Sequence, residues 1–327
     1  MMGRERRFVE RRPAANRAPH RIRTMKFPRL ILGLALLAPF AAAQAKTQEQ
    51  LAALRDEKLG KKVFTRAEWS FDFDEAMENA SGSGKPILAY FTRSYAHSGP
   101  CDALESGLLS SPEFVEFAKS VVLFVHVTSH CEDDDRPHLL RELGFVSHPS
   151  LCFLDAEGKV TVRSPQRDVP SLVRSRDLLL ELDGLRAAAE EGDEDAPRGV
   201  FLCEVELGML TSEQIRQRMG TFELDEEERA MVDQALVDLE VRELRSKTRE
   251  LGADTVGKKM ADMARAGRKP SADGSQFFWQ MVLSWCAKNS DAALAQRAFD
   301  ELSGQKAPPQ MIERNRALLE QAKSGGK

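Results

Sequence analysis

The residues of this 327-residue chain that could do chemistry are concentrated in one run, Ser98-Gly99-Pro100-Cys101, which follows the apolar residues 87–92. An apolar strand-like run followed by serine, glycine and proline predicts a turn into a helix that begins near Ser98. Two cysteines at these outer positions would form a dithiol redox centre, because exchange between dithiol and disulfide needs an attacking and a resolving sulfur. Since serine stands first here, the run offers Cys101 as a single thiol.

Ser98 and Cys101 each allow two interpretations. Ser98 is either the remnant of a redox pair or simply the N-cap of the helix, a position that serine fills well. Cys101 is either a small buried apolar residue or a thiol that forms a mixed disulfide with a partner. An internal disulfide with Cys131 is a further alternative, because Cys131 follows the predicted strand 121–127 and would lie at the same edge of the sheet.

The chain has five cysteines, and their number and spacing limit their chemistry. An odd number leaves at least one thiol unpaired or intermolecular, and no paired C-x-x-C spacing of a zinc site is present. Cys152 falls within a predicted strand and is expected in the core. Cys203 and Cys286 lie further along the chain, outside the region of the Ser98 run.

Histidines near these cysteines raise a different possibility, copper or zinc binding. Thiolate and imidazole are suitable ligands for both metals. The candidate ligands are His97, Cys101, Cys131 and His148, with His126 and His130 close in sequence. The alternative is that His97 and His148 are loop residues facing solvent and that His126 belongs to a strand. Of the two interpretations we favour this one, so the sequence predicts no resident metal or other cofactor.

Composition and charge exclude some classes of partner. The net charge is −4, with 42% hydrophobic and 30% charged residues, which is typical of a soluble globular protein. No basic face stands out beyond the N-terminal stretch, so nucleic-acid binding is not expected.

The N-terminal 45 residues are predicted to be a signal peptide. Residues 30–43 are apolar but short for a membrane span, and Ala43-Gln44-Ala45 has the small-x-small form that a signal peptidase requires. We expect cleavage after Ala45 and a periplasmic or secreted protein with no membrane segment left. Met25 is a candidate for the true start, which would make residues 1–24 a misassigned extension.

Strand and helix patterns alternate from residue 64 to residue 190. A helical lead-in over 46–63 precedes them, and the region then holds helices near 72–80, 98 and 111, strands at 87–92 and 121–127, and a hairpin over 151–163. A long amphipathic helix over 170–190 closes the region. This order predicts an α/β domain.

The region 64–190 resembles the thioredoxin superfamily, and in particular its secreted thioredoxin-like domains. The matching residues are Trp69 before a helix with Glu75-Ala76, then Lys85-Pro86-Ile87-Leu88, Phe91-Thr92, Gly99-Pro100-Cys101, Ser111-Pro112-Glu113-Phe114-Val115, the loop Gly144-Phe145-Val146-Ser147-His148-Pro149-Ser150 and the turn 155–159. The resemblance implies a central mixed sheet flanked by helices. It also implies that Pro149 is cis and leaves the backbone of His148 free to pair with an extended peptide.

Two departures from the family pattern put its redox activity in doubt. Ser98 occupies the place of the attacking cysteine, whose pKa the helix N-terminus lowers in the family. Tyr95-Ala96-His97 makes the approach to the site longer than usual. The candidate site residues are therefore Cys101, Ser98 and Cys131 for chemistry, and Gly99, Pro100, His97, His148 and Pro149 for substrate binding.

Beyond residue 190 the pattern changes. Residues 191–204, which begin with an acidic run, are predicted to be a linker. Residues 205–327 are predicted to form an all-α domain, with helices at 211–219, 225–251, 256–266, 273–288, 291–303 and 309–322. The apolar helix around Phe277, Trp279 and Trp285 is expected to be its core.

Two functional hypotheses follow from these patterns. In the first, the chain is a thiol-disulfide oxidoreductase that uses Cys101, with Cys131 as a second thiol. In the second, it is a redox-inactive module that binds extended polypeptide in the groove beside His148-Pro149. Partners are other proteins' thiols or polypeptide segments in either case.

Overall fold

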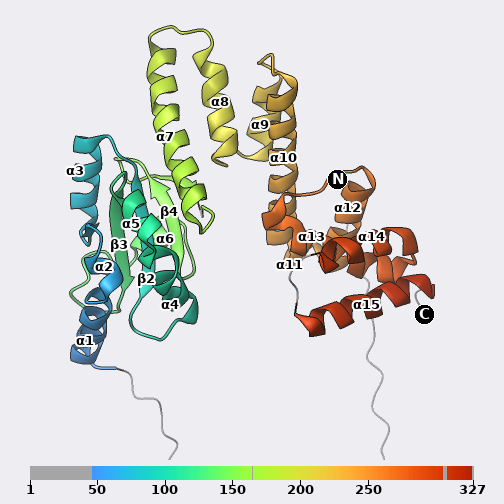
Figure 1. Cartoon of the computed structure of the whole chain (residues 1–327), viewed down its shortest axis with the longest axis horizontal. Helices are drawn as coiled ribbons and strands as arrows, with labels where there is room; N and C mark the ends of the chain where they lie inside the picture. Colours follow the sequence, from blue (N-terminus) through green and yellow to red (C-terminus); the bar gives the residue numbers. More distant parts are fainter. Residues whose placement is uncertain (1–45, 164, 305–307, 326–327) are drawn as a thin grey trace, which may run out of the picture. The chain divides into compact units, whose positions relative to one another are not determined.

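The computed structural model describes residues 46–163, 165–304 and 308–325 (Figure 1). The predicted signal peptide, residues 1–45, lies outside the described residues. No helix in the described ranges is both long and apolar enough to cross a membrane.

A five-stranded mixed sheet forms the centre of the N-terminal region. Its order is β1-β3-β2-β4-β5, in which β1, β3 and β2 run parallel while β4 and β5 are antiparallel to their neighbours. The strands are β1 (Trp69–Ser70), β2 (Ile87–Arg93), β3 (Val122–Thr128), β4 (Ser150–Leu154) and β5 (Val160–Arg163).

The central strand β2 is buried on both faces, as its unbroken apolar sequence predicts. Alternate residues of β2 contribute to different cores: Leu88 and Tyr90 to one face, Ile87, Ala89 and Phe91 to the other. The first face also contains side chains of the helices α2 (Lys62–Thr65), α4 (Gly99–Ser106), α5 (Pro112–Ala118) and α7 (Val169–Glu190). The second face contains those of α3 (Phe73–Ser83) and α6 (Leu139–Glu142). The sheet is therefore a middle layer between two layers of helices, which confirms the predicted fold class.

The helices of this region begin where the sequence provides caps. They are α1 (Gln48–Leu59), α2 (Lys62–Thr65), α3 (Phe73–Ser83), α4 (Gly99–Ser106), α5 (Pro112–Ala118), α6 (Leu139–Glu142) and α7 (Val169–Glu190). Thr47 forms a capping box with Gln50, and Ser98, Ser111 and Asp168 each accept a hydrogen bond from a backbone N–H of the first turn. The helical lead-in predicted over 46–63 corresponds to α1 and the start of α2.

The segment predicted as a linker is mostly helical. Residues 191–195 separate α7 from α8 (Ala196–Glu206), and Cys203 and Leu207 belong to the same apolar cluster as the sheet. A Cβ at Gly199 would lie 2.9 Å from Leu185 Cδ1, so the glycine allows α8 to pack closely on α7. The acidic run thus ends at residue 195, and the apolar side chains that follow at helical spacing bury a face of α8.

Seven further helices follow in the described residues, close to the predicted bounds. They are α9 (Ser212–Met219), α10 (Glu226–Ser246), α11 (Thr248–Leu251), α12 (Ala253–Arg265), α13 (Ala272–Asn289), α14 (Ala292–Ser303) and α15 (Pro309–Lys323). Phe278, Trp279, Val282 and Leu283 of α13 are fully buried in the largest cluster of this region. The prediction that this helix forms the core is confirmed.

Candidate functional site

Ser98 is the N-cap of α4 in the structure. Its hydroxyl accepts a hydrogen bond from the backbone N–H of Cys101 at 3.4 Å, and its backbone is extended, with φ −143° and ψ 95°. Only 7% of the residue is exposed. The serine therefore satisfies one of the free N–H groups at the start of the helix, which is the structural role that the sequence allowed for it.

Cys101 lies in the first turn of α4 and is completely buried, with 0% of its surface exposed. Cys131 lies in the loop after β3, as predicted, and is 6% exposed. All five cysteines are free, so the internal disulfide between Cys101 and Cys131 is not formed in this structure. Neither thiol of the site can meet a partner's sulfur unless the covering residues move.

The other three cysteines are buried and held in the thiol form. Burial raises the pKa of Cys152 to about 12, that of Cys203 to about 11 and that of Cys286 to about 12. The thiolate is the nucleophile in disulfide exchange. These three residues are therefore structural, and Cys152 lies within β4 as the sequence predicts.

The peptide bond between His148 and Pro149 is cis, as the family resemblance implies. The imidazole Nε2 of His148 lies 3.0 Å from Thr128 Oγ1, at the end of β3. Burial, reinforced by the positive charge of Arg93, lowers the pKa of His148 to about 4. The side chain next to Pro149 is thus neutral at ordinary pH.

The longer approach to the site, Tyr95-Ala96-His97, is folded against its neighbours. Arg93 Nη2 donates to the carbonyl of His97 at 3.0 Å, and the Tyr95 ring stacks on His130 with centroids 4.0 Å apart. His130 has a left-handed backbone, with φ +62°. The stack joins the loop that precedes α4 to the loop that follows β3.

The metal-binding alternative finds no support in the structure. Within the described ranges, no three or more His, Cys, Asp or Glu side chains are grouped so as to hold a metal ion. His97 points to solvent and lies 3.2 Å from Asp102 Oδ2, whereas Cys101 is buried in the helix. His97, Cys101, Cys131 and His148 therefore do not form the ligand set that their proximity in sequence suggested.

A buried carboxylate, Glu105, lies one turn beyond Cys101 on α4 and was not predicted as a site residue. It is 3% exposed, and its Oε1 accepts hydrogen bonds from the Tyr90 hydroxyl at 2.9 Å and the Thr92 hydroxyl at 3.0 Å. Lys58 Nζ lies 2.5 Å from the same oxygen, and Lys61 Nζ lies 3.1 Å from Oε2. The arrangement compensates the buried negative charge with two cations and two hydroxyl donors.

A partly open pocket of about 270 Å³ lies between part of α1 and the first turn of α4. Its lining combines side chains of α1 and α2's N-cap with those of the site loop: Leu54, Glu57, Lys58, Lys61, Arg93, Ser94, Ala96, His97, Ser98 and Asp102. The helix that precedes the sheet thus faces the Ser98 run directly.

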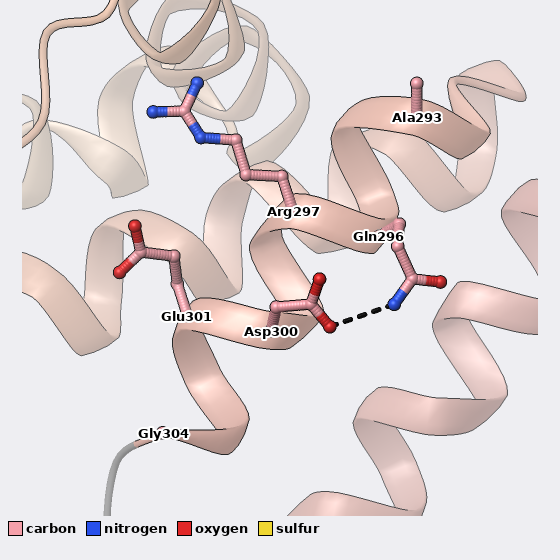
Figure 2. Close-up of a pocket in the computed structure, with 6 residues that line it drawn as sticks. All are labelled: Ala293, Gln296, Arg297, Asp300, Glu301 and Gly304. Atoms are coloured by element: carbon pink, nitrogen blue, oxygen red, sulfur yellow. Dashed lines mark hydrogen bonds between the residues drawn. The ribbon is translucent and has the colours of Figure 1, made fainter.

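A shallow, open pocket of about 700 Å³ lies along α14, and none of its lining residues belongs to the Ser98 site (Figure 2). Its lining residues all come from α14 or its C-cap: Ala293, Gln296, Arg297, Asp300, Glu301 and Gly304. Gln296 donates to Asp300 at 2.9 Å, Arg297 donates to the Ala264 carbonyl at 3.0 Å, and Lys269 pairs with Glu301 at 3.3 Å. These polar groups are already paired, and none of the lining residues is a nucleophile.

A comparison with protein-family models supports the assignment of the sheet region. Residues 73–165 match the family model described as a thioredoxin-like domain. A solved structure titled "DsbH Oxidoreductase" is similar with 26% sequence identity, covering 30% of this chain and 71% of that chain, at a TM-score of 0.27. The search of curated proteins gave no match. The sheet order, the cis-proline and the family match together identify a thioredoxin-like domain, which confirms the resemblance proposed for residues 64–190.

Proposed function

We propose that this chain is an exported thioredoxin-fold protein that binds extended segments of other proteins and reacts with their thiols or disulfides only through Cys101. The observation that carries the proposal is the position of Ser98, whose hydroxyl caps α4 where a redox pair would need a sulfur. A chain of this design has the scaffold of an oxidoreductase without the dithiol cycle.

The chemistry available to one sulfur is limited. The Cys101 thiolate, once exposed, attacks one sulfur of a partner disulfide, and the partner's other sulfur leaves as a thiolate. The product is a mixed disulfide. Because Ser98 has no sulfur to attack this bond, release requires a thiol from outside the run, and the run cannot complete a catalytic cycle by itself.

The loop before Pro149 supports polypeptide binding. The resemblance to the thioredoxin superfamily implies that the residue before this proline, His148, offers its backbone to an extended peptide, which would bind as an added strand. Val146, in the same loop, is 93% exposed, which is unusual for a β-branched apolar side chain. A bound segment would pair with the His148 backbone and place an apolar side chain against Val146.

Export is part of the proposal because of the predicted signal peptide. The first helix of the described residues, α1, starts at Gln48 and has a capping box on Thr47. Cleavage after Ala45 would therefore leave the first helix and its cap intact, and the mature protein would be periplasmic or secreted.

Insulin reduction combined with thiol trapping tests the redox part. The protein beginning at Lys46 is expected to give no catalytic turnover, to form a trapped mixed disulfide, and to lose that species in Cys101→Ser. Ser98→Cys is expected to gain turnover, because it restores the second sulfur to the run. Turnover by the parent that is lost in both Cys101→Ser and Cys131→Ser would overturn the proposal in favour of a Cys101–Cys131 oxidoreductase.

Binding of a reduced, carboxymethylated polypeptide tests the second part. Val146→Asp is expected to weaken binding about tenfold, because a charge replaces the apolar contact. Leu180→Asp, which places the same charge on another exposed apolar side chain, on α7, is the matched control. Equal affinities of the two variants would contradict a groove at this loop.

A further inference from the structure

The segment 46–61, which comprises α1 and the residues on either side of it, lies outside the range that matches the thioredoxin-like model and contacts the loops of the site. Lys46 Nζ donates to the carbonyl of Tyr95 at 3.0 Å. The Gln48 side chain donates to the carbonyl of His130 at 3.5 Å and accepts from the N–H of Glu132 at 2.9 Å. The start of the segment therefore bridges the two loops that the Tyr95–His130 stack joins.

The second half of the segment is attached by ion pairs. Arg55 forms a two-pronged contact with Asp133, at 2.6 and 3.1 Å, in the loop that carries Cys131. Lys58 reaches Glu105 on α4, and Lys61 reaches Asp102 at 3.0 Å on the same helix. Every residue that the segment contacts in this way lies within four positions in the sequence of Tyr95, Cys101 or Cys131.

The segment is held mainly by polar contacts. Leu51 is the one apolar side chain that α1 buries, and its other buried residue is Lys58. A pocket of about 270 Å³ is lined by Leu54 and Glu57 together with Ser98, so this face of α1 is not fully packed against the start of α4. Segments with few buried apolar contacts open locally more readily than the packed core does.

We propose that residues 46–57 are a displaceable cover of the thiol site, and that the buried Lys58–Glu105 ion pair remains formed when they move. When the cover is docked, Cys101 and Cys131 are buried; when it is displaced, both thiols and the loops beside them become accessible. The inference rests on the proposed function, because Cys101 is buried and can react with a partner only after the cover has moved. The opening itself is a property of the fold and is measured without any partner.

The test is the rate at which N-ethylmaleimide alkylates each cysteine of the native protein, followed by mass spectrometry of peptides. The thiolate sulfur adds to the carbon–carbon double bond, and the adjacent carbon takes a proton from water. Arg55→Asp replaces the attraction to Asp133 by repulsion and is expected to raise the rates at Cys101 and Cys131 about fivefold. Arg55→Asp combined with Asp133→Arg restores the pair in reverse and is expected to restore the parent rates.

Two controls separate local opening from unfolding. Arg174→Asp breaks an ion pair of the same kind with Glu206, far along the chain from the cover, and is expected to leave both rates unchanged. Cys286, buried in the core of α13, is an internal control in every variant because its alkylation reports global unfolding. High salt, which screens exposed ion pairs, should act in the same direction as Arg55→Asp.

The outcomes distinguish the cover from the proposed function. Equal Cys101 rates in Arg55→Asp, the double variant and Arg174→Asp would overturn the cover. Faster alkylation without any mixed disulfide to a partner would support the cover and overturn thiol exchange through Cys101. Faster alkylation together with faster mixed-disulfide formation would support both.

Discussion

Two buried polar centres of the thioredoxin-like domain differ in how completely their groups are paired. The Glu105 centre consists of Glu105, Tyr90, Thr92 and Lys58. The hydroxyls of Tyr90 and Thr92 and the ammonium group of Lys58 all contact the Glu105 carboxylate. The His126 centre, by contrast, consists of His126 and Asp134 beside the Arg136 backbone. His126 Nδ1 and Asp134 Oδ2 are shielded from solvent without any hydrogen-bond partner among the described residues.

The difference shows which side of the site is fixed and which can adapt. His126 Nε2 lies 3.1 Å from the Arg136 carbonyl and 3.8 Å from Asp134 Oδ1, so its contacts within the loop are fewer and longer than those of Glu105. A fully paired buried network specifies one arrangement, whereas a partly paired one tolerates others. The α4 side of the site is therefore the rigid one, and the loop after β3 is the adaptable one.

The largest expected effect comes from breaking the Glu105 centre at its charge. Lys58→Met leaves Glu105 with Lys61 as its remaining cation. We expect the substitution to lower the free energy of unfolding by about 3 kcal/mol, because a buried charge that loses its partner is costly. Urea denaturation followed by circular dichroism measures this loss. Lys58→Met with Glu105→Gln is expected to cost less than the sum of the two single substitutions. Strict additivity would mean that the two side chains do not act as a pair.

A smaller effect is expected from removing one hydroxyl. Tyr90→Phe deletes a donor to the Glu105 carboxylate and should lower the free energy of unfolding by about 2 kcal/mol. The chain has two tyrosines, so Tyr95→Phe is a matched control: the Tyr95 ring stacks on His130, and its hydroxyl makes no hydrogen bond within the described residues. The same urea experiment compares them. Similar losses in the two variants would remove the basis for calling the Glu105 centre the rigid side.

Acid should lower the free energy of unfolding through His148. Burial lowers the pKa of His148 from 6.5 to about 4, so between these pH values the unfolded chain binds a proton that the folded protein does not. Stability contributed by this residue is present above pH 6.5 and falls as the pH is lowered toward 4. We expect a loss of about 1 kcal/mol, reduced by solvent around the half-buried ring. His148→Gln should flatten this part of the stability profile, and parallel profiles for parent and variant would contradict the assignment.

The smallest effect is expected at Asp134. Asp134→Asn keeps the oxygen that accepts the Arg136 N–H, at 3.1 Å, and changes the atom that has no partner. The free energy of unfolding should change by less than about 0.5 kcal/mol. A loss as large as that of Tyr90→Phe, measured by urea denaturation at pH 7, would show that the His126 centre is held as firmly in one arrangement as the Glu105 centre.

Features that depend on local sequence were predicted well. Strand 87–92 corresponds to β2, strand 121–127 to β3 and helix 170–190 to α7, because unbroken apolar runs and capping residues act over a few neighbours. The N-cap role of Ser98 was likewise available from the local sequence, whereas the cis bond at Pro149 was implied by the family resemblance.

Features that depend on contacts between distant segments were not predicted. Glu105 follows Cys101 by four residues, but a glutamate at that spacing usually marks a solvated helix face, and Lys58 lies 47 positions away in another helix. The helix α8 was missed because the acidic run before it dominated the interpretation of the segment. The metal-ligand set was suggested by closeness in sequence, but in the fold His97 lies at the surface while Cys101 is buried.

The two outer strands of the sheet have a consequence for self-association. The sheet ends at β1, which has two residues, and at β5, which has four. Long open strand edges recruit other chains into continuous sheets, whereas short ones give a second molecule little backbone to pair with. A domain that displays an exposed valine and offers backbone groups at one loop thus avoids offering a template for aggregation along its sides.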